Sequence, residues 1–289
     1  MLWGFELEFK QSLRTKKLWV ILGVMMLLYI PTFYIQKTTG VEVKSVQEAV
    51  SILVGSVTGF GGFFIAILAL LIGATAINGE IEKGTLRVAM SKPVKRLSYI
   101  GGKFLAHTLI VLLALILTTF VGVAGLKWLG APIEGKLITE SLLLNGLLML
   151  AMVQLIALGY ILSTTIRSSS TALGVALVLV FVAFMIMPAI VQYMAAKDTV
   201  LNNNPDLNAF RDKSREYRTR YLFYDPLEQI NIIVNDATEV SGESGREKVE
   251  YVGISRGIAK NPINFGILIG LPFVYLAASL YRFTRMDLR

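Results

Sequence analysis

Six long runs without Asp, Glu, Lys or Arg constrain what this chain can fold into more than any other feature. A helix needs about 20 apolar residues to cross the hydrocarbon core of a lipid bilayer. A segment in lipid must satisfy its own backbone hydrogen bonds, and the alternating pattern of a barrel is absent, so we predict helices. The six runs are Leu18–Gln36, Ala49–Gly79, Phe104–Leu126, Ser141–Ile166, Ser168–Ala196 and Asn261–Tyr281.

The composition excludes most other classes of protein. Only 17% of the residues are charged, against roughly 25% in a soluble domain. The chain has no cysteine and one histidine, which excludes disulfide scaffolds and thiolate metal sites and leaves little for histidine-based catalysis. We therefore predict an all-α polytopic membrane protein with six transmembrane helices.

The distribution of charge predicts the orientation of the chain in the membrane. The N-terminus, the loop after the second run, the turn between the fourth and fifth runs and the tail hold 14 basic and 5 acidic residues, a net charge of +9. The other side holds 14 basic and 15 acidic residues, a net charge of −1. Basic residues favour the cytoplasmic side. We expect both termini to be cytoplasmic, in the plasma membrane, and no nucleic-acid partner despite the overall charge of +8.

The polar segments divide the chain further. Residues 1–17 carry apolar side chains at helical spacing, which predicts an amphipathic helix in the membrane interface; a simple positive flank is the alternative. Residues 18–196 hold the first five spans, and residues 261–289 hold the sixth span and the tail. Residues 197–260 predict a small, mainly helical extracellular cap. It should contain a helix over Leu207–Tyr221, a second helix that begins at Asp225-Pro226, and a loop at Ser241–Gly245.

The cytoplasmic segment 78–103 combines charge with apolar side chains. Gly84 permits a sharp turn, Thr85 begins a short helix that reaches Met90, and Pro93 ends it. Apolar groups on a charged loop suggest a docking site for another protein. An ordinary basic loop is the reading that the pattern leaves open.

The same segment resembles the permease subunits of type-2 ABC transporters. It reads Glu-x-Glu-x-Gly-Thr-Leu, then Ser-x-Pro-x-x-Arg, then Gly102-Lys103 at the start of an apolar helix. The long loop between spans 5 and 6 resembles the branch with permeases for sodium extrusion and copper-enzyme maturation. The resemblance implies that segment 78–103 couples to an ATPase through Glu80, Glu82, Gly84, Thr85, Leu86, Arg87, Val88, Met90, Ser91, Pro93 and Arg96.

The resemblance also implies the partners. In the lipid bilayer, two permease copies, identical or closely paralogous, would pair, and each would rest on a separate ABC ATP-binding subunit that holds ATP and Mg²⁺. Gly101-Gly102-Lys103-Phe104 is not a phosphate-binding loop, because it lacks the preceding glycine and the Ser or Thr. We therefore expect a transport subunit, an exporter by resemblance, with no catalytic residue, cofactor or metal of its own.

A channel or secondary transporter without an ATPase partner is the alternative function. Carriers of that kind usually place charged residues at mid-membrane, and the six runs contain none. His107 and Gln154 are candidates for a substrate path, with hydrogen bonding between helices as the alternative. Gly55 and Gly59 have the small-residue spacing that predicts a close helix contact.

Overall fold

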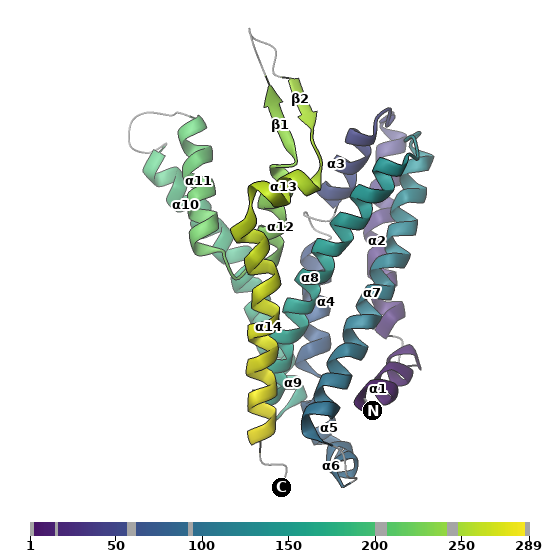
Figure 1. Cartoon of the computed structure of the whole chain (residues 1–289), viewed down its shortest axis with the longest axis vertical. Coiled ribbons are helices and arrows are strands. Elements are labelled where there is room, and N and C mark those ends of the chain that lie inside the picture. Colours follow the sequence, from purple (N-terminus) through teal and green to yellow (C-terminus); the bar gives the residue numbers. More distant parts are fainter. Residues whose placement is uncertain are drawn as a thin grey trace.

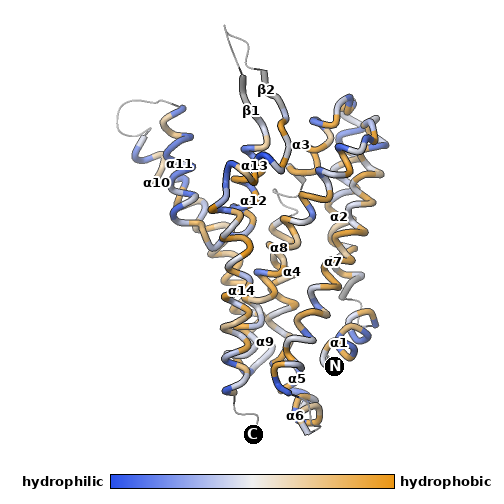
Figure 2. The backbone as a smooth tube through the Cα atoms, in the orientation of Figure 1, coloured by the Kyte–Doolittle hydropathy of each residue, from blue (hydrophilic) through white to orange (hydrophobic). Residues whose placement is uncertain are grey.

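The computed structural model describes residues 3–14, 17–56, 62–91, 95–199, 207–241 and 248–286. Long helices run side by side, and the two chain ends lie at the same end of the molecule as α6 (Thr85–Met90). The strands and α11–α13 lie at the opposite end (Figure 1). Hydrophobic residues dominate the length of the long helices, and hydrophilic residues gather toward both ends (Figure 2).

Four helices in the described part of the chain are long and apolar enough to cross a bilayer. They are α7 (Arg96–Trp128), α8 (Gly135–Thr165), the continuous helix Ser169–Thr199, and α14 (Pro262–Arg285). These helices confirm the predicted third to sixth spans. The predicted first span corresponds to α2 (Lys17–Thr38), and the second is divided into α3 (Val46–Ser56) and α4 (Gly62–Ala74). Residues 57–61 lie outside the described part, so the count of six spans stays a prediction.

The fifth span changes its helical geometry midway. It consists of α9 (Ser169–Phe181), the π-helical turn η2 (Val182–Ile186) and α10 (Met187–Thr199). Pro188 lies two residues after the last residue of the π-turn, Ile186. Proline has no N–H to donate, and its ring clashes with the carbonyl group four residues earlier. A wider turn before Pro188 relieves this clash, which accounts for the position of η2.

Helix α8 lies at the centre of the bundle and packs against α4 and α14. Gly73 of α4 meets Gly159 of α8 so closely that a Cβ on either would lie within 2.5 Å of a carbonyl oxygen of the other helix. This is the close contact that small residues permit. Gly55, where the sequence pattern predicted such a contact, has open space around it within the described chain, so that contact stays a prediction. Gly59 lies outside the described residues.

The cap is built from three helices and a strand pair. Its elements are α11 (Leu207–Tyr221), α12 (Pro226–Asn235), β1 (Thr238–Ser241), β2 (Lys248–Tyr251) and α13 (Ile254–Lys260). The strands are antiparallel, with Thr238 opposite Tyr251. The sequence analysis did not anticipate them, because four residues per strand are too few for a periodic signal. Ser241, assigned to a loop, ends β1, and residues 242–247 lie outside the described part.

Buried polar contacts hold the cap on the spans. The Glu140 carboxylate, near the start of α8, accepts hydrogen bonds from the Tyr251 hydroxyl (2.7 Å) and the Ile254 N–H (2.9 Å). On α14, the Asn264 side-chain amide donates to Gln229 Oε1 of α12 at 2.7 Å. The cap is therefore positioned by the transmembrane helices rather than by a core of its own.

Helix α12 begins as the sequence predicted. The Asp225 carboxylate accepts hydrogen bonds from the N–H groups of Leu227 (2.8 Å) and Glu228 (3.2 Å), and Pro226 occupies the first helical position. Burial raises the pKa of Asp225 to about 7. Burial also raises the pKa of Glu228, partly offset by the Arg218 guanidinium. The cap therefore has carboxyl groups that hold a proton more tightly in the folded state than in the unfolded chain.

This difference predicts the pH dependence of cap stability. Because the folded-state pKa of Asp225 lies above its unfolded value, its stabilising contribution is complete below about pH 4 and is lost as the pH rises through about 7. We expect the melting temperature of the purified protein to fall between pH 5 and pH 8. Asp225→Asn should flatten this slope while keeping the helix cap, since asparagine also caps helices well.

Asp236→Asn provides the control. Burial raises the pKa of Asp236, but hydrogen bonds from Arg215 and Asn261 lower it by more, so it titrates below this range. Asp236→Asn should lower the melting temperature without changing how steeply it depends on pH. If Asp225→Asn also left that pH dependence unchanged, Asp225 would not be the group responsible.

Candidate functional site

The predicted coupling segment forms two short helices at the end of the molecule that carries the chain ends. Helix α5 (Asn78–Glu82) is joined to α6 by Gly84, whose φ of +68° lies in the left-handed region that favours glycine. The Thr85 hydroxyl donates to the Glu80 carbonyl at 3.3 Å. The turn predicted from Gly84 is therefore present, with α6 directed away from the spans (Figure 1).

The apolar residues of α6 do not share one surface. Leu86 is 1% exposed and packs into the core, whereas Val88 is 67% exposed and Met90 is partly buried. Leu86 and Val88 point to opposite sides because they are two residues apart on a helix. Leu86 therefore attaches α6 to its own chain and is not free to enter a partner, which corrects the expectation from sequence. Val88 is the exposed apolar group, with Arg87 and Ser91 exposed beside it.

Backbone and side-chain hydrogen bonds fix α5 to the transmembrane helices. The Ser163 hydroxyl of α8 accepts from the N–H groups of Ile77 (2.8 Å) and Asn78 (3.1 Å). The Glu82 carboxylate accepts from the Ser169 N–H at the start of α9, at 2.8 Å. Glu80 also contacts its own chain, through Lys103. Both glutamates of the predicted coupling segment, Glu80 and Glu82, therefore have partners within the chain.

Arg96 makes contacts within the chain, and its coupling role stays a prediction. Its guanidinium donates to the carbonyl oxygens of Thr284 (3.1 Å) and Met286 (3.0 Å), so it ties the start of α7 to the end of α14. Pro93 lies outside the described residues.

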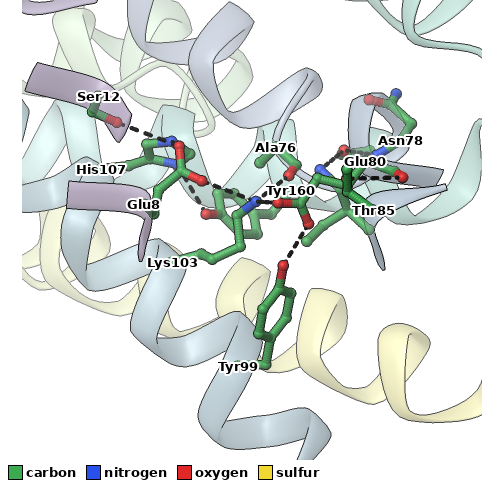
Figure 3. A network of polar contacts seen from close by, with 12 residues as sticks. Glu8, Ser12, Ala76, Asn78, Glu80, Thr85, Tyr99, Lys103, His107 and Tyr160 are labelled. Atoms are coloured by element: carbon green, nitrogen blue, oxygen red, sulfur yellow. Dashed lines mark hydrogen bonds and ion pairs between the residues drawn. The ribbon is translucent and has the colours of Figure 1, made fainter. Parts of the chain in front are cut away.

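Lys103 of α7 lies at the centre of a buried ion cluster (Figure 3). Its ammonium group is 2.9 Å from Glu8 Oε2 and 2.7 Å from Glu80 Oε1, and it donates to the Ala76 carbonyl at 2.9 Å. The side chains of Lys103 and Glu8 are 3% and 5% exposed. The Tyr99 hydroxyl donates to Glu80 at 2.7 Å. One ammonium group therefore connects the N-terminal helix, the coupling segment and α7.

His107 belongs to the same cluster. Its Nε2 is 2.8 Å from Glu8 Oε1, and its Nδ1 is 2.9 Å from the Tyr160 hydroxyl of α8. A carboxylate only accepts hydrogen bonds, so Nε2 carries a proton. With a neutral imidazole the three charged groups Glu8, Glu80 and Lys103 sum to −1, and an imidazolium would bring the cluster to zero.

Gln154, the other candidate for a substrate path, lies six residues before Tyr160 on α8. Its amide donates to the Tyr224 carbonyl at the base of the cap, at 2.8 Å. Its Oε1 is buried without a hydrogen-bond partner among the described residues. His107 makes a hydrogen bond between α7 and α8, the alternative that the sequence left open, whereas Gln154 bonds to the turn before α12. A substrate path through these residues stays a prediction.

Helix α1 (Trp3–Arg14) attaches to α7 by a polar face rather than an apolar one. Gly4, Glu8 and Ser12 recur every four residues and are buried, while Leu7 and Leu13 are exposed. A Cβ on Gly4 would lie 2.1 Å from a carbonyl oxygen of α7. The i, i+4 spacing of Glu8 with Gly4 and Ser12 is the one sequence signal for this buried face.

Such a cluster is sensitive to the loss of any member. Removing one partner of a buried ion pair leaves an uncompensated charge in a poorly solvated site. Glycines where α1 crosses α7 let the two helices come close enough for these ion pairs. A Cβ on Gly102 of α7 would lie 2.7 Å from the backbone nitrogen of Phe5 in α1. The Gly102-Lys103 pair is thus explained by close approach and charge pairing.

The long apolar helices describe a multi-pass membrane protein, and comparison with known proteins identifies its family. The profile of the ABC-2 family transporter proteins matches residues 2–288, so the chain belongs to the ABC-2 family. This confirms the resemblance inferred from the coupling motif, and it makes the chain a transport component rather than a catalytic one.

Two curated relatives carry the name "Probable ABC transporter permease protein NosY", in agreement with the branch expected from sequence. The protein from Pseudomonas aeruginosa is 34% identical over 130 residues, which cover 44% of this chain and 47% of that protein. The protein from Stutzerimonas stutzeri is 29% identical over 132 residues, which cover 43% of this chain and 45% of that protein. In both comparisons the chain spans less than half the length of the relative.

The ion cluster predicts a large stability difference between two lysine replacements. Lys103→Met leaves Glu8 and Glu80 buried without their cation, which should destabilise the protein by about 3–5 kcal/mol. Lys10→Met removes a partner from the exposed Lys10–Glu6 pair and should leave the melting temperature unchanged. Thermal unfolding of the two purified variants makes the comparison. Equal melting temperatures would show that the cluster does not hold α1, α5 and α7 together.

Proposed function

We propose that the chain is the permease subunit of an ATP-driven ABC transporter, an exporter, in which two permease copies form the translocation path. Each copy would rest on a separate ATP-binding subunit that supplies ATP hydrolysis with Mg²⁺. Membership of the ABC-2 family supports this function. The main structural support is helix α6, which projects from the spans and exposes Val88. The preceding helix α5 is hydrogen-bonded to α8 and α9.

The contacts of the coupling segment suggest how movement would pass from the ATPase to the spans. A force on α6 acts on α5, which is fixed to α8 through Ser163 and to α9 through Glu82. Glu80 transmits the same displacement to Lys103 of α7, and through it to Glu8 of α1. Packed elements with such bonds move as units rather than deform continuously. The segment is therefore suited to couple a partner to three spans at once.

The charge asymmetry supports a cytoplasmic position for this end of the molecule. The net charge of +9 belongs to the side that holds segment 78–103 and both termini, and basic residues favour the cytoplasm. An ATPase that uses cytoplasmic ATP would find α6 accessible there. The cap, with a side whose net charge is −1, would face outward.

Replacement of Val88 tests the docking surface. Burying a valine side chain contributes roughly 1.5–3 kcal/mol, so Val88→Asp should reduce recovery of the ATPase by about tenfold or more. Val88→Ile should retain it. The measurement is co-purification of the ATPase with each variant from membranes that contain equal amounts of permease.

Leu86→Asp serves as a contrast. It places a carboxylate in the core of the chain, so it should lower the amount of folded permease. Wild-type recovery of the ATPase with Val88→Asp would remove α6 as the docking element. A chain that transports without any ATPase would instead favour a channel or secondary transporter.

Labelling of single cysteines tests the orientation. The natural chain has no cysteine, so Ser91→Cys and Ser244→Cys can be labelled without background. An impermeant thiol reagent added to intact cells should label position 244 and not position 91, until the membrane is opened. Labelling of position 91 from outside would reverse the proposed topology.

A further inference from the structure

A second feature of the coupling end is a cavity lined by arginines. Its volume is about 440 Å³, and it lies between α5, α6, the end of α8 and the end of α14. Four arginines line it, and none of its lining residues within the described part of the chain is a carboxylate. The residues that matter here are Arg87, Arg167, Arg282 and Arg285, with Thr164 and Thr165 at the end of α8.

The arginines have no charged partner within the described chain. The ion pairs of the described residues include none of the four, and only Arg285 makes a side-chain contact of note, above the Tyr281 ring at 4.4 Å. Arg87, Arg167 and Arg282 are exposed. Four like charges around one cavity repel each other unless an anion is present. The cavity therefore has the charge and the donors for a phosphate group.

The position of the cavity favours a lipid as the source of that phosphate. Thr164 and Thr165 end α8, and Tyr281 to Arg285 form the last turn of α14, so the cavity lies where the apolar helices end. Val274 lies two turns before Tyr281 on the same face of α14, and both side chains are exposed. An acyl chain could follow this apolar face while the headgroup enters the cavity. Basic pockets between helices at the cytoplasmic surface are a known setting for anionic headgroups.

We propose that this cavity binds the headgroup of an anionic phospholipid from the cytoplasmic leaflet. Arg167 and Arg282 contact the phosphate, and Arg87 of α6 closes the site. A lipid in this place lies against both the coupling segment and α14. The proposed lipid site depends on the proposed orientation of the chain, which the cysteine labelling tests separately. It does not depend on transport activity.

Native mass spectrometry of the purified full-length protein tests the proposal. The protein is titrated with phosphatidylglycerol and with phosphatidylcholine of the same acyl chains. The wild type should prefer phosphatidylglycerol. Arg167→Gln combined with Arg282→Gln should weaken phosphatidylglycerol binding roughly tenfold, because two charged contacts are lost, and should leave phosphatidylcholine binding unchanged.

Lys83→Gln combined with Lys95→Gln is the matched control. These lysines are exposed at the same end but do not line the cavity, so the same change of charge should leave phosphatidylglycerol binding within about twofold. Neither arginine has a hydrogen bond or ion pair to lose among the described residues, and the melting temperature of each variant without lipid checks the fold. As a second readout, phosphatidylglycerol should raise the melting temperature of the wild type and of the control but not of the arginine variant.

Three results would overturn the proposal. Equal weakening in the lysine control would reduce the effect to surface charge. Displacement of phosphatidylglycerol by millimolar inorganic phosphate would make it a site for free anions. Unchanged lipid binding in the arginine variant, with loss of the co-purifying ATPase, would assign the arginines to acidic residues of that partner.

Discussion

The arrangement of the coupling end depends on one buried ammonium group. Lys103 is placed between Glu8 and Glu80 by three elements that are far apart in sequence, and it makes a charged contact with each carboxylate. Burying a charge is costly unless it is paired, so the three elements are stable only when they meet. The ion cluster therefore fixes α1 and α5 on α7, while hydrogen bonds to Ser163 fix α5 on α8.

This constraint explains features that otherwise look unrelated. Gly4 and Gly102 allow α1 to approach α7 closely enough for Glu8 to reach Lys103. The buried Leu86 side chain packs α6 against the rest of the chain, so α6 and α5 form one rigid segment. A partner that presses on the exposed side of α6 would thus act on the spans directly. The arginine cavity lies on the other side of the same segment, where a bound lipid would bear on its position.

Much of the fold follows from local sequence signals, and the site follows less well. Long apolar runs predicted the third to sixth spans, and Asp225 with Pro226 predicted the start of α12, because periodicity and capping are local. The positive φ of Gly84 was also predictable. The ion cluster was not, since Glu8 pairs with a residue 95 positions away and its charge resembles that of a solvated helix face. Leu86 and Val88 could be separated only once the packing of α6 was known.

If Lys103 holds α1 on the coupling segment, the two should move as one body, and a distance measurement in the transport complex checks this. Spin labels at Leu13→Cys and Lys83→Cys, both exposed positions, report the distance between α1 and the end of α5 in a chain without native cysteine. Labelled chain is diluted with unlabelled chain, with the ATPase bound, in lipid vesicles. The account predicts the same distance distribution with and without trapped ATP, and a broader one in Lys103→Met. A distribution that shifts when ATP binds to the wild-type complex would contradict it.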